Sequence, residues 1–195
     1  MKPGLLSIGP LLFLAVTAGA AENSGLKSGV FSPPRLAPDF SLRASDGSEF
    51  KLSRYRGKVI VLGFGYTSCP DVCPTTLADL AQVRKTLGAA GKELQVVYVT
   101  VDPERDSVER LREYLAAFDP TFVGATGTPE QLAEVRKAYG IQISRKAVEG
   151  SRSAYLVHHS SFVYLIDREG KLRALRPFGA SVEDLANDIR TLVKR

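Results

Sequence analysis

The stretch that decides the fold is KVIVLGFGYTSCPDVCP, residues 58–74, which also holds both cysteines of the chain. Residues 59–64 are continuously apolar, and such a run is typical of a strand buried on both faces of a sheet. Cys69 follows this strand, and Cys73 precedes apolar residues that fall on one helical face, Leu77, Leu80, Ala81 and Leu87. A helix is therefore expected to begin at the second cysteine.

Apolar spacing predicts alternating strands and helices on both sides of this stretch. Short apolar runs indicate strands, whereas apolar residues three and four positions apart indicate helices. Upstream, an Asp46-Gly47 turn between residues 40–42 and 50–52 predicts a hairpin. Downstream, the expected elements are strands over 94–101, 122–125, 161–166 and 171–176, and helices over 108–118, 132–139 and 182–193.

This order of elements predicts an α/β fold, a thioredoxin-like three-layer α/β/α sandwich with a mixed central sheet. Arg168-Glu169-Gly170 joins the last two strands and is typical of a hairpin turn. The helix over 108–118 is expected to begin at Asp106, because Glu109 stands three residues later, as in a capping box.

The composition indicates one ordinary globular domain. Of the 195 residues, 44% are hydrophobic and 24% are charged, and no segment is of low complexity. The net charge of +5 comes from 26 lysines and arginines scattered among 21 acidic residues. Because there is no basic run, the sequence argues against a nucleic-acid partner.

The first residues have the pattern of an export signal. Lys2 precedes an apolar segment that ends at an A-x-A cleavage pattern, Ala18-Gly19-Ala20. The segment is shorter than the ~20 residues of a spanning helix, which favours a cleaved signal peptide over a short membrane anchor for residues 1–20. Residues 21–36 contain Ser, Gly, Lys and paired prolines and predict a flexible tether. The globular domain is expected over residues 37–195, exported to the periplasmic side.

The placement of the cysteines indicates chemistry rather than reinforcement. A domain of this size needs no disulfide staples. Cys69 is expected at the carboxyl end of a strand and Cys73 at a helix N-terminus, where the helix dipole favours a thiolate. Both sulfurs are therefore expected to be partly exposed and easily ionised. Three residues separate them, so the motif is not the C-x-x-C of a thioredoxin, and the wider loop suits either two thiolates on one ion or a disulfide.

The histidines offer a third ligand. Two thiolates with an imidazole form a soft ligand set that favours copper, whereas structural zinc prefers four ligands and the chain has no second cysteine pair. The chain has two histidines, His158 and His159, directly before the strand over 161–166. In a thioredoxin-like layout this loop faces the N-terminus of the first helix. Because neighbouring extended residues point to opposite sides, one of the two is expected to reach the ion.

Four segments resemble the Sco/SenC family of copper proteins. They are GYTSCPDVCP at residues 65–74, APDF at 37–40, VDPERD at 101–106 and YLVHHS at 155–160. The resemblance covers nearly the whole domain and implies a thioredoxin-like fold that binds one copper ion, Cu(I) or Cu(II), through two cysteines and a distant histidine. By position, it implies the ligands Cys69, Cys73 and His159.

Two further residues are candidates for a supporting role. His158 stands where family members often have Asp, which places a second imidazole beside the implied ligand. Asp102 lies in the VDPERD segment and is a candidate carboxylate that supports the ligands from outside. Its alternative role is that of a loop residue before the turn at Pro103.

The resemblance implies a copper metallochaperone rather than an enzyme. Its implied receiver is the subunit of cytochrome c oxidase that bears the copper A centre. Because metal loading needs both thiols reduced, a periplasmic thiol reductase is a further expected partner, and another copper chaperone is a candidate partner. An alternative is a periplasmic thiol–disulfide oxidoreductase that uses Cys69 and Cys73 without metal, although the spacing differs from that of thioredoxin. A peroxidase is a third interpretation, because residues 37–40 and 56–59 resemble the opening of peroxiredoxins, but the paired cysteines do not fit that pattern.

Overall fold

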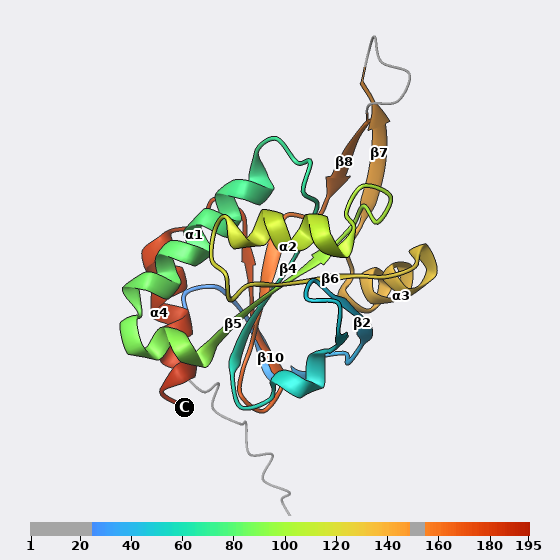
Figure 1. Ribbon diagram of the computed structural model, residues 1–195. Coiled ribbons are helices and arrows are strands. Elements are labelled where there is room, and N and C mark those ends of the chain that lie inside the picture. Colours follow the sequence, from blue (N-terminus) through green and yellow to red (C-terminus); the bar gives the residue numbers. More distant parts are fainter. Residues whose placement is uncertain (1–24, 149–154) are drawn as a thin grey trace, which may run out of the picture.

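The computed structural model describes residues 25–148 and 155–195, so the predicted signal peptide lies outside the described residues. Within these ranges an eight-stranded sheet has the order β1-β10-β9-β4-β5-β6-β2-β3 (Figure 1). β4, β5 and β6 run parallel and the other neighbours antiparallel, so the sheet is mixed, as predicted. The strands are β1 (Gly29–Leu36), β2 (Ser41–Ala44), β3 (Glu49–Lys51), β4 (Val59–Gly65), β5 (Leu94–Thr100), β6 (Val123–Thr126), β9 (Phe162–Ile166) and β10 (Lys171–Pro177).

Helices cover both faces of this sheet. On one face, α1 and α4 contact each other and α2 packs over Gly124 of β6 (Figure 1). On the other face, the Tyr139 ring of α3 packs against the rings of Phe64 and Tyr164. The predicted three-layer sandwich is confirmed. The helices are α1 (Val72–Thr86), α2 (Val108–Ala116), α3 (Pro129–Tyr139) and α4 (Val182–Val193), with short 3-10 turns at Leu52–Tyr55 and Gly88–Glu93.

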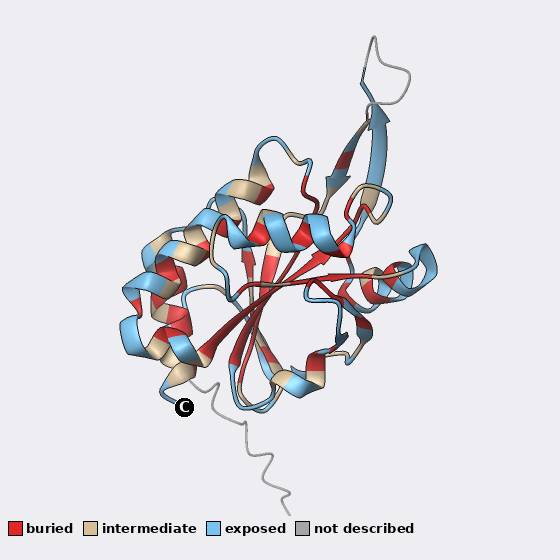
Figure 2. Ribbon diagram, in the orientation of Figure 1, coloured by how far each residue is buried: buried red, intermediate tan, exposed pale blue. Residues whose placement is uncertain are grey.

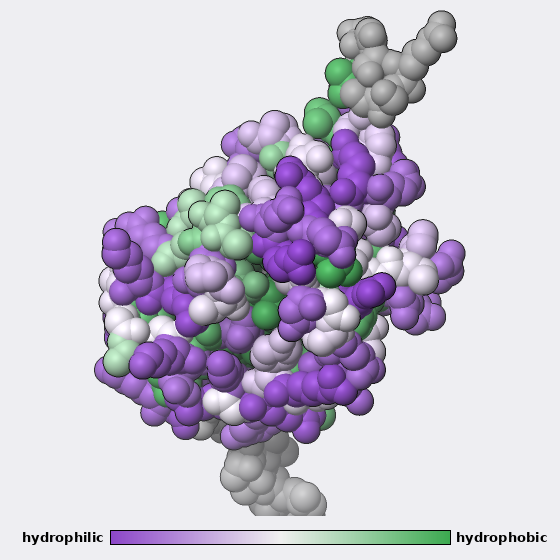
Figure 3. Space-filling model, in the orientation of Figure 1, coloured by the Kyte–Doolittle hydropathy of each residue, from purple (hydrophilic) through white to green (hydrophobic). Residues whose placement is uncertain are grey.

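The core is centred on β4 and β5. Every residue of these two strands is buried, as their uninterrupted apolar runs predicted. Figure 2 shows buried residues along the central strands and on the inward sides of the helices. Figure 3 shows polar side chains over most of the surface in the same view, with small apolar areas between them. None of the helices in the described ranges is long and apolar enough to cross a membrane.

α2 does not begin at the residue that the capping pattern suggested. Its N-cap is Ser107, whose hydroxyl accepts a hydrogen bond from the Arg110 N–H at 3.1 Å. Asp106 is instead fully buried and accepts hydrogen bonds from Thr67 and Thr100. A buried carboxylate needs such donors, and they compete with the helix N–H groups for its oxygens. The prediction that Asp106 caps this helix is therefore wrong.

The first described residues belong to the domain. The sequence predicts a flexible tether over residues 21–36, but residues 29–36 form β1, which pairs antiparallel with β10. Just before β1, the buried carboxylate of Asp188 on α4 accepts hydrogen bonds from the N–H groups of Lys27 at 2.6 Å and Ser28 at 2.9 Å. For these residues the tether prediction is wrong. Nearly all of β1 is exposed, so no apolar alternation marks it in the sequence.

A separate two-stranded sheet projects beyond the main one (Figure 1). It consists of β7 (Ile143–Ala147) and β8 (Tyr155–His159), which pair antiparallel with Ile143 opposite His159. Most of its residues are exposed or half-buried, so the sequence carries no apolar pattern for it. The histidines therefore lie at the end of a strand, where the sequence predicted a loop.

Candidate metal centre

The two cysteines lie where β4 leads into α1. Cys73 occupies the first turn of α1, and it is 3% exposed. Cys69 stands in the preceding turn, where it is half-buried and its N–H donates to the Tyr66 carbonyl at 3.3 Å. Both are free thiols. The unpaired N–H groups and the dipole at the start of α1 stabilise negative charge on sulfur at this place.

The turn that carries Cys69 is anchored by the buried Asp106. This carboxylate accepts hydrogen bonds from the Thr67 N–H at 3.1 Å and the Thr67 hydroxyl at 2.6 Å, and from the Thr100 hydroxyl at 2.6 Å. Burial raises the pKa of Asp106, although these donors oppose the shift. The contacts join the cysteine turn to the end of β5 and fix its position before any ligand arrives.

His159 reaches the cysteines from the end of β8. Its Nε2 lies 3.4 Å from the Sγ of Cys73, although 86 positions separate the two residues. Its Nδ1 lies 3.0 Å from the carbonyl oxygen of Ser160. Because a carbonyl oxygen only accepts, Nδ1 is the donor in this contact, and in that tautomer of the neutral ring the lone pair of Nε2 is directed toward the sulfur. An imidazole held in this way is typical of a metal-ligating histidine.

The two thiols differ in ionisation. The pKa of Cys69 is lowered, chiefly by a hydrogen bond from the Cys73 thiol, while burial opposes the shift. The pKa of Cys73 is raised, because its proton is held in that hydrogen bond and because the side chain is desolvated. The prediction that both sulfurs are partly exposed and easily ionised is confirmed for Cys69 and wrong for Cys73. At Cys73 the hydrogen bond to Cys69, and after it the exclusion of water, disfavour the thiolate that the helix N-terminus would otherwise favour.

This arrangement is an incomplete set of soft ligands. An ion about 2.3 Å from a sulfur and about 2.0 Å from a nitrogen, the distances found for zinc, fits between atoms as close as Cys73 Sγ and His159 Nε2. Across residues 25–148 and 155–195, however, no three His, Cys, Asp or Glu side chains are already gathered as a finished metal site. The Cys73–His159 pair is formed, and Cys69 borders it from the preceding turn.

The structure does not bring His158 to the sulfurs. His158 is exposed, whereas Val157 on one side of it is buried and His159 on the other is half-buried. This alternation is the one expected of neighbouring strand residues. His158 therefore points away from the side of β8 that faces the cysteines.

Asp102 lies at the other end of β8 from His159. It is fully buried, forms a short ion pair with Arg105, and accepts a hydrogen bond from the Tyr155 hydroxyl at 2.7 Å. The Arg105 guanidinium lies 3.9 Å from the centre of the Tyr155 ring, and Arg145 of β7 lies 3.8 Å from the carboxylate. None of these contacts is with a cysteine or with His159. Asp102 thus holds the outer part of the β7–β8 hairpin, toward its turn, and its link to His159 at the base runs along β8.

Replacing Tyr155 by Phe tests this fastening. The variant keeps the ring over Arg105 and removes the donor to the buried Asp102 carboxylate, so we expect the free energy of unfolding to fall by about 1 to 3 kcal/mol. Urea unfolding followed by circular dichroism measures it. Leu156→Ala is the control, because Leu156 is 37% exposed on the same strand and its loss should change the value by less than about 0.5 kcal/mol. If Tyr155→Phe and Leu156→Ala had the same free energy of unfolding, the hydrogen bond from Tyr155 to Asp102 would not stabilise the hairpin.

Gly65 leaves the space that the buried sulfur occupies. A Cβ added at Gly65 would lie 2.0 Å from the Tyr98 hydroxyl oxygen and 2.8 Å from Cys73 Sγ, both far inside van der Waals contact. At Gly63, two residues earlier on the same strand, the nearest atom would be 3.5 Å away, in Val163. Neither Gly65 nor Tyr98 was predicted from the sequence to belong to this site. A glycine inside a buried strand was the available signal, since it often marks a close approach of neighbouring groups.

We therefore expect Gly65→Ala to be much more harmful than Gly63→Ala. The added methyl at position 65 must displace the ring of Tyr98 or the sulfur of Cys73, and such overpacking costs about 1 to 3 kcal/mol. The methyl at position 63 meets ordinary contact distances, so its effect should stay below about 1 kcal/mol. Chemical denaturation of both variants provides the comparison. Equal losses in the free energy of unfolding for Gly65→Ala and Gly63→Ala would show that the close approach of Tyr98 and Cys73 to Gly65 does not matter for stability.

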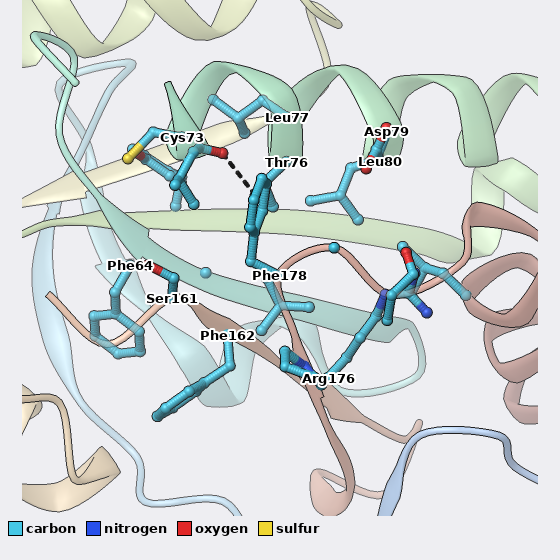
Figure 4. Close-up of a pocket in the computed structure, with 18 of the residues that line it drawn as sticks. Phe64, Cys73, Thr76, Leu77, Asp79, Leu80, Ser161, Phe162, Arg176 and Phe178 are labelled. Carbon is cyan, nitrogen blue, oxygen red and sulfur yellow. Dashed lines mark hydrogen bonds between the residues drawn. The ribbon is translucent and has the colours of Figure 1, made fainter. Parts of the chain in front are cut away.

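A small hollow opens beside the cysteine and the histidine. Its volume is about 40 Å³, enough for an ion or a few waters, and Cys73 and His159 both line it. Figure 4 shows Cys73 toward one end and Arg176 toward the other, with Phe162 and Phe178 between them. Phe178 is 42% exposed at its edge. The Cys73 sulfur, although buried, thus borders a space that opens to the surface.

Comparisons with known proteins agree with the resemblance seen in the sequence. The sequence profile of the SCO1/SenC family matches residues 31–194. A SCO2-like protein of Rickettsia conorii is 35% identical over 137 residues, which are 70% of this chain and 67% of that protein. Yeast Sco1 with copper bound superposes with a TM-score of 0.74 at 34% identity, over 83% of this chain and 90% of that one. Bradyrhizobium japonicum ScoI with copper bound gives a TM-score of 0.73 at 29% identity, over 80% and 99% of the two chains. The chain thus belongs to the SCO1/SenC family.

Proposed function

We propose that this chain is a copper metallochaperone that binds one copper ion through Cys69, Cys73 and His159. The observation that carries the proposal is the 3.4 Å approach of His159 Nε2 to Cys73 Sγ, with the Nδ1 proton held by a backbone carbonyl. The copper-bound relatives from yeast and Bradyrhizobium japonicum support copper as the ion.

The ligand chemistry suits temporary binding. Thiolates are soft ligands that hold Cu(I), and the imidazole also accommodates Cu(II). Three ligands leave a coordination position open, so that thiolates of a receiving protein can take the ion by ligand exchange. This is carriage of a cargo rather than turnover of a substrate. The chain accordingly acts as a binding protein and not as an enzyme.

The partners follow from this chemistry and from the family. The Sco family is one of cytochrome c oxidase assembly proteins, and we assign as receiver the oxidase subunit that bears the copper A centre. Both thiols must be reduced before copper binds, which calls for a periplasmic thiol reductase, and another copper chaperone supplies the ion. The function places the domain on the periplasmic side, with residues 1–20 as a signal peptide or a short membrane anchor.

A second candidate function is thiol–disulfide exchange without metal. The ionised, half-buried Cys69 beside the protonated, buried Cys73 is the pairing that an oxidoreductase uses to attack a disulfide. In such a reaction the Cys69 thiolate attacks one sulfur of the target, and Cys73 then displaces the reduced target and closes the Cys69–Cys73 disulfide. The same cysteines serve both functions, and His159 separates them, because disulfide exchange does not need a metal ligand.

Copper titration of the reduced protein tests the main proposal. Under anaerobic conditions, Cu(I) is added in competition with a coloured chelator, and we expect one tightly bound ion per chain. The loaded protein is then mixed with a reduced, soluble copper A domain, and metal analysis of the two separated proteins should find the ion on that domain. A reduced chain that leaves all copper on the chelator, yet reduces the disulfide of a separately prepared, oxidised copper A domain, would establish the second function instead.

A further inference from the structure

We propose that the Tyr98 hydroxyl donates a hydrogen bond to the sulfur of Cys73 once that sulfur is a copper-bound thiolate. Tyr98 is thereby a positioning residue that tunes the metal, and not a ligand. The inference rests on the proposed function, because it takes Cys73 as a copper ligand. It adds a residue on β5 that none of the sequence motifs includes.

The first observation is a buried donor without a partner. Tyr98 lies at the middle of β5, and it is 3% exposed. Its hydroxyl is buried and has no hydrogen-bond partner among the described residues. Leaving a buried hydroxyl unpaired is costly, so such a group in a native core needs an explanation.

The second observation is where this hydroxyl lies. The space next to Gly65 is bordered by the Tyr98 hydroxyl oxygen on one side and by Cys73 Sγ on another, 2.0 and 2.8 Å from the position of an added Cβ. Tyr98 is also opposite Gly63 in the β4–β5 pairing, so neither glycine of β4 puts a side chain between the hydroxyl and the sulfur. The hydroxyl of Tyr98 and the sulfur of Cys73 therefore border the same small space beside Gly65, where the hydroxyl can serve the sulfur.

The chemistry of sulfur explains why the Tyr98 hydroxyl has no partner while Cys73 is a thiol. A thiol is a weak acceptor, whereas a thiolate is a strong one. Copper binding deprotonates the cysteine, so the acceptor that suits Tyr98 forms when the ion arrives. Hydrogen bonding around a cysteine ligand is one of the means by which proteins set the reduction potential of copper. A donor draws electron density from the sulfur and thus favours Cu(I) over Cu(II).

The test compares Tyr98→Phe with the wild-type chain, both loaded with copper. Loss of the donor should move the sulfur-to-Cu(II) charge-transfer absorption to longer wavelength, because the sulfur electrons become easier to remove. It should also favour Cu(II) over Cu(I) by about tenfold, which lowers the one-electron potential by about 59 mV. Absorption spectroscopy and a potentiometric titration give the two values.

Tyr114→Phe is the matched control. Tyr114 of α2 has the other tyrosine hydroxyl in the described ranges that is buried without a partner, and no hydrogen bond joins it to Cys73. Both substitutions remove an unpaired hydroxyl and keep the ring, so both variants should fold, with a melting temperature at or above that of the wild type. We expect only Tyr98→Phe to alter the absorption and the potential.

The outcomes separate the two ideas. Equal spectra and potentials for Tyr98→Phe, Tyr114→Phe and the wild type would overturn the role of Tyr98 and leave the copper function intact. A wild-type chain that shows no sulfur-to-copper absorption at all would overturn the proposed function and this inference together.

Discussion

Replacement of both Cys69 and Cys73 by alanine should abolish tight copper binding. The variant retains one of the three proposed ligands, and binding free energies of thiolate-rich metal sites are on the order of 10 kcal/mol. Losing both sulfurs should therefore weaken Cu(I) binding by at least about a thousandfold. Competition titration against a Cu(I) chelator, with metal analysis of the protein after gel filtration, measures the loss.

The fold should survive this double substitution, which makes the result interpretable. Cys69 is half-buried, and the truncation of the small buried Cys73 side chain should cost about 1 kcal/mol. Circular dichroism and the urea midpoint serve as the control. Full retention of one copper per chain by a folded double variant would show that the ion is bound elsewhere and would end the metal assignment.

Replacement of His159 by alanine should lower copper affinity by about 10- to 100-fold while disulfide exchange continues. Even changes to groups that merely support a ligand cost 10- to 100-fold in metal affinity, so loss of a direct ligand should cost at least as much. The neighbouring His158→Ala is the matched control, because that side chain is exposed on the other side of β8 and should change affinity by less than about threefold. The Cu(I) titration and the rate of reduction of a model disulfide are measured on both variants.

The comparison of the two histidines decides between the candidate functions. A copper chaperone predicts that the two variants differ in affinity, whereas a protein devoted to disulfide exchange predicts that they behave alike in both measurements. If His158→Ala proves the more harmful of the two, the ligand is the exposed imidazole, and β8 must turn over when the ion binds.

The central part of the fold could be predicted from the sequence because its elements carry strong apolar patterns. β4 and β5 are buried along their whole length, and α4 presents a continuous apolar stripe to the sheet. β1 and the β7–β8 hairpin could not be predicted in this way. The side chains of these strands are mostly exposed, so the strands are held mainly by backbone pairing with another strand. Backbone pairing leaves no apolar alternation in the sequence from which a strand could be predicted.

The sequence was enough to predict which residue types act as ligands, but only part of the burial and hydrogen bonding around them. Cysteine spacing and the place of the histidines in the chain pointed to the juxtaposition that the structure has for Cys73 and His159. The burial of Cys73 and the unpaired Tyr98 hydroxyl depend on how α1 packs onto β4 and β5, which no local pattern records. Asp106 shows the same limit, because its tertiary partners Thr67 and Thr100 outweigh its local capping pattern.

The anchoring of Lys27 and Ser28 by Asp188 has a practical consequence for measuring transfer. It fixes the start of the described chain against α4, and Gly25 lies beside Thr191 near the end of that helix. The sulfurs lie at the opposite end of the molecule, at the start of α1 (Figure 1). A biotin group placed at Arg195 or directly before Gly25 would thus immobilise every molecule on a sensor chip with its cysteines facing the flowing solution.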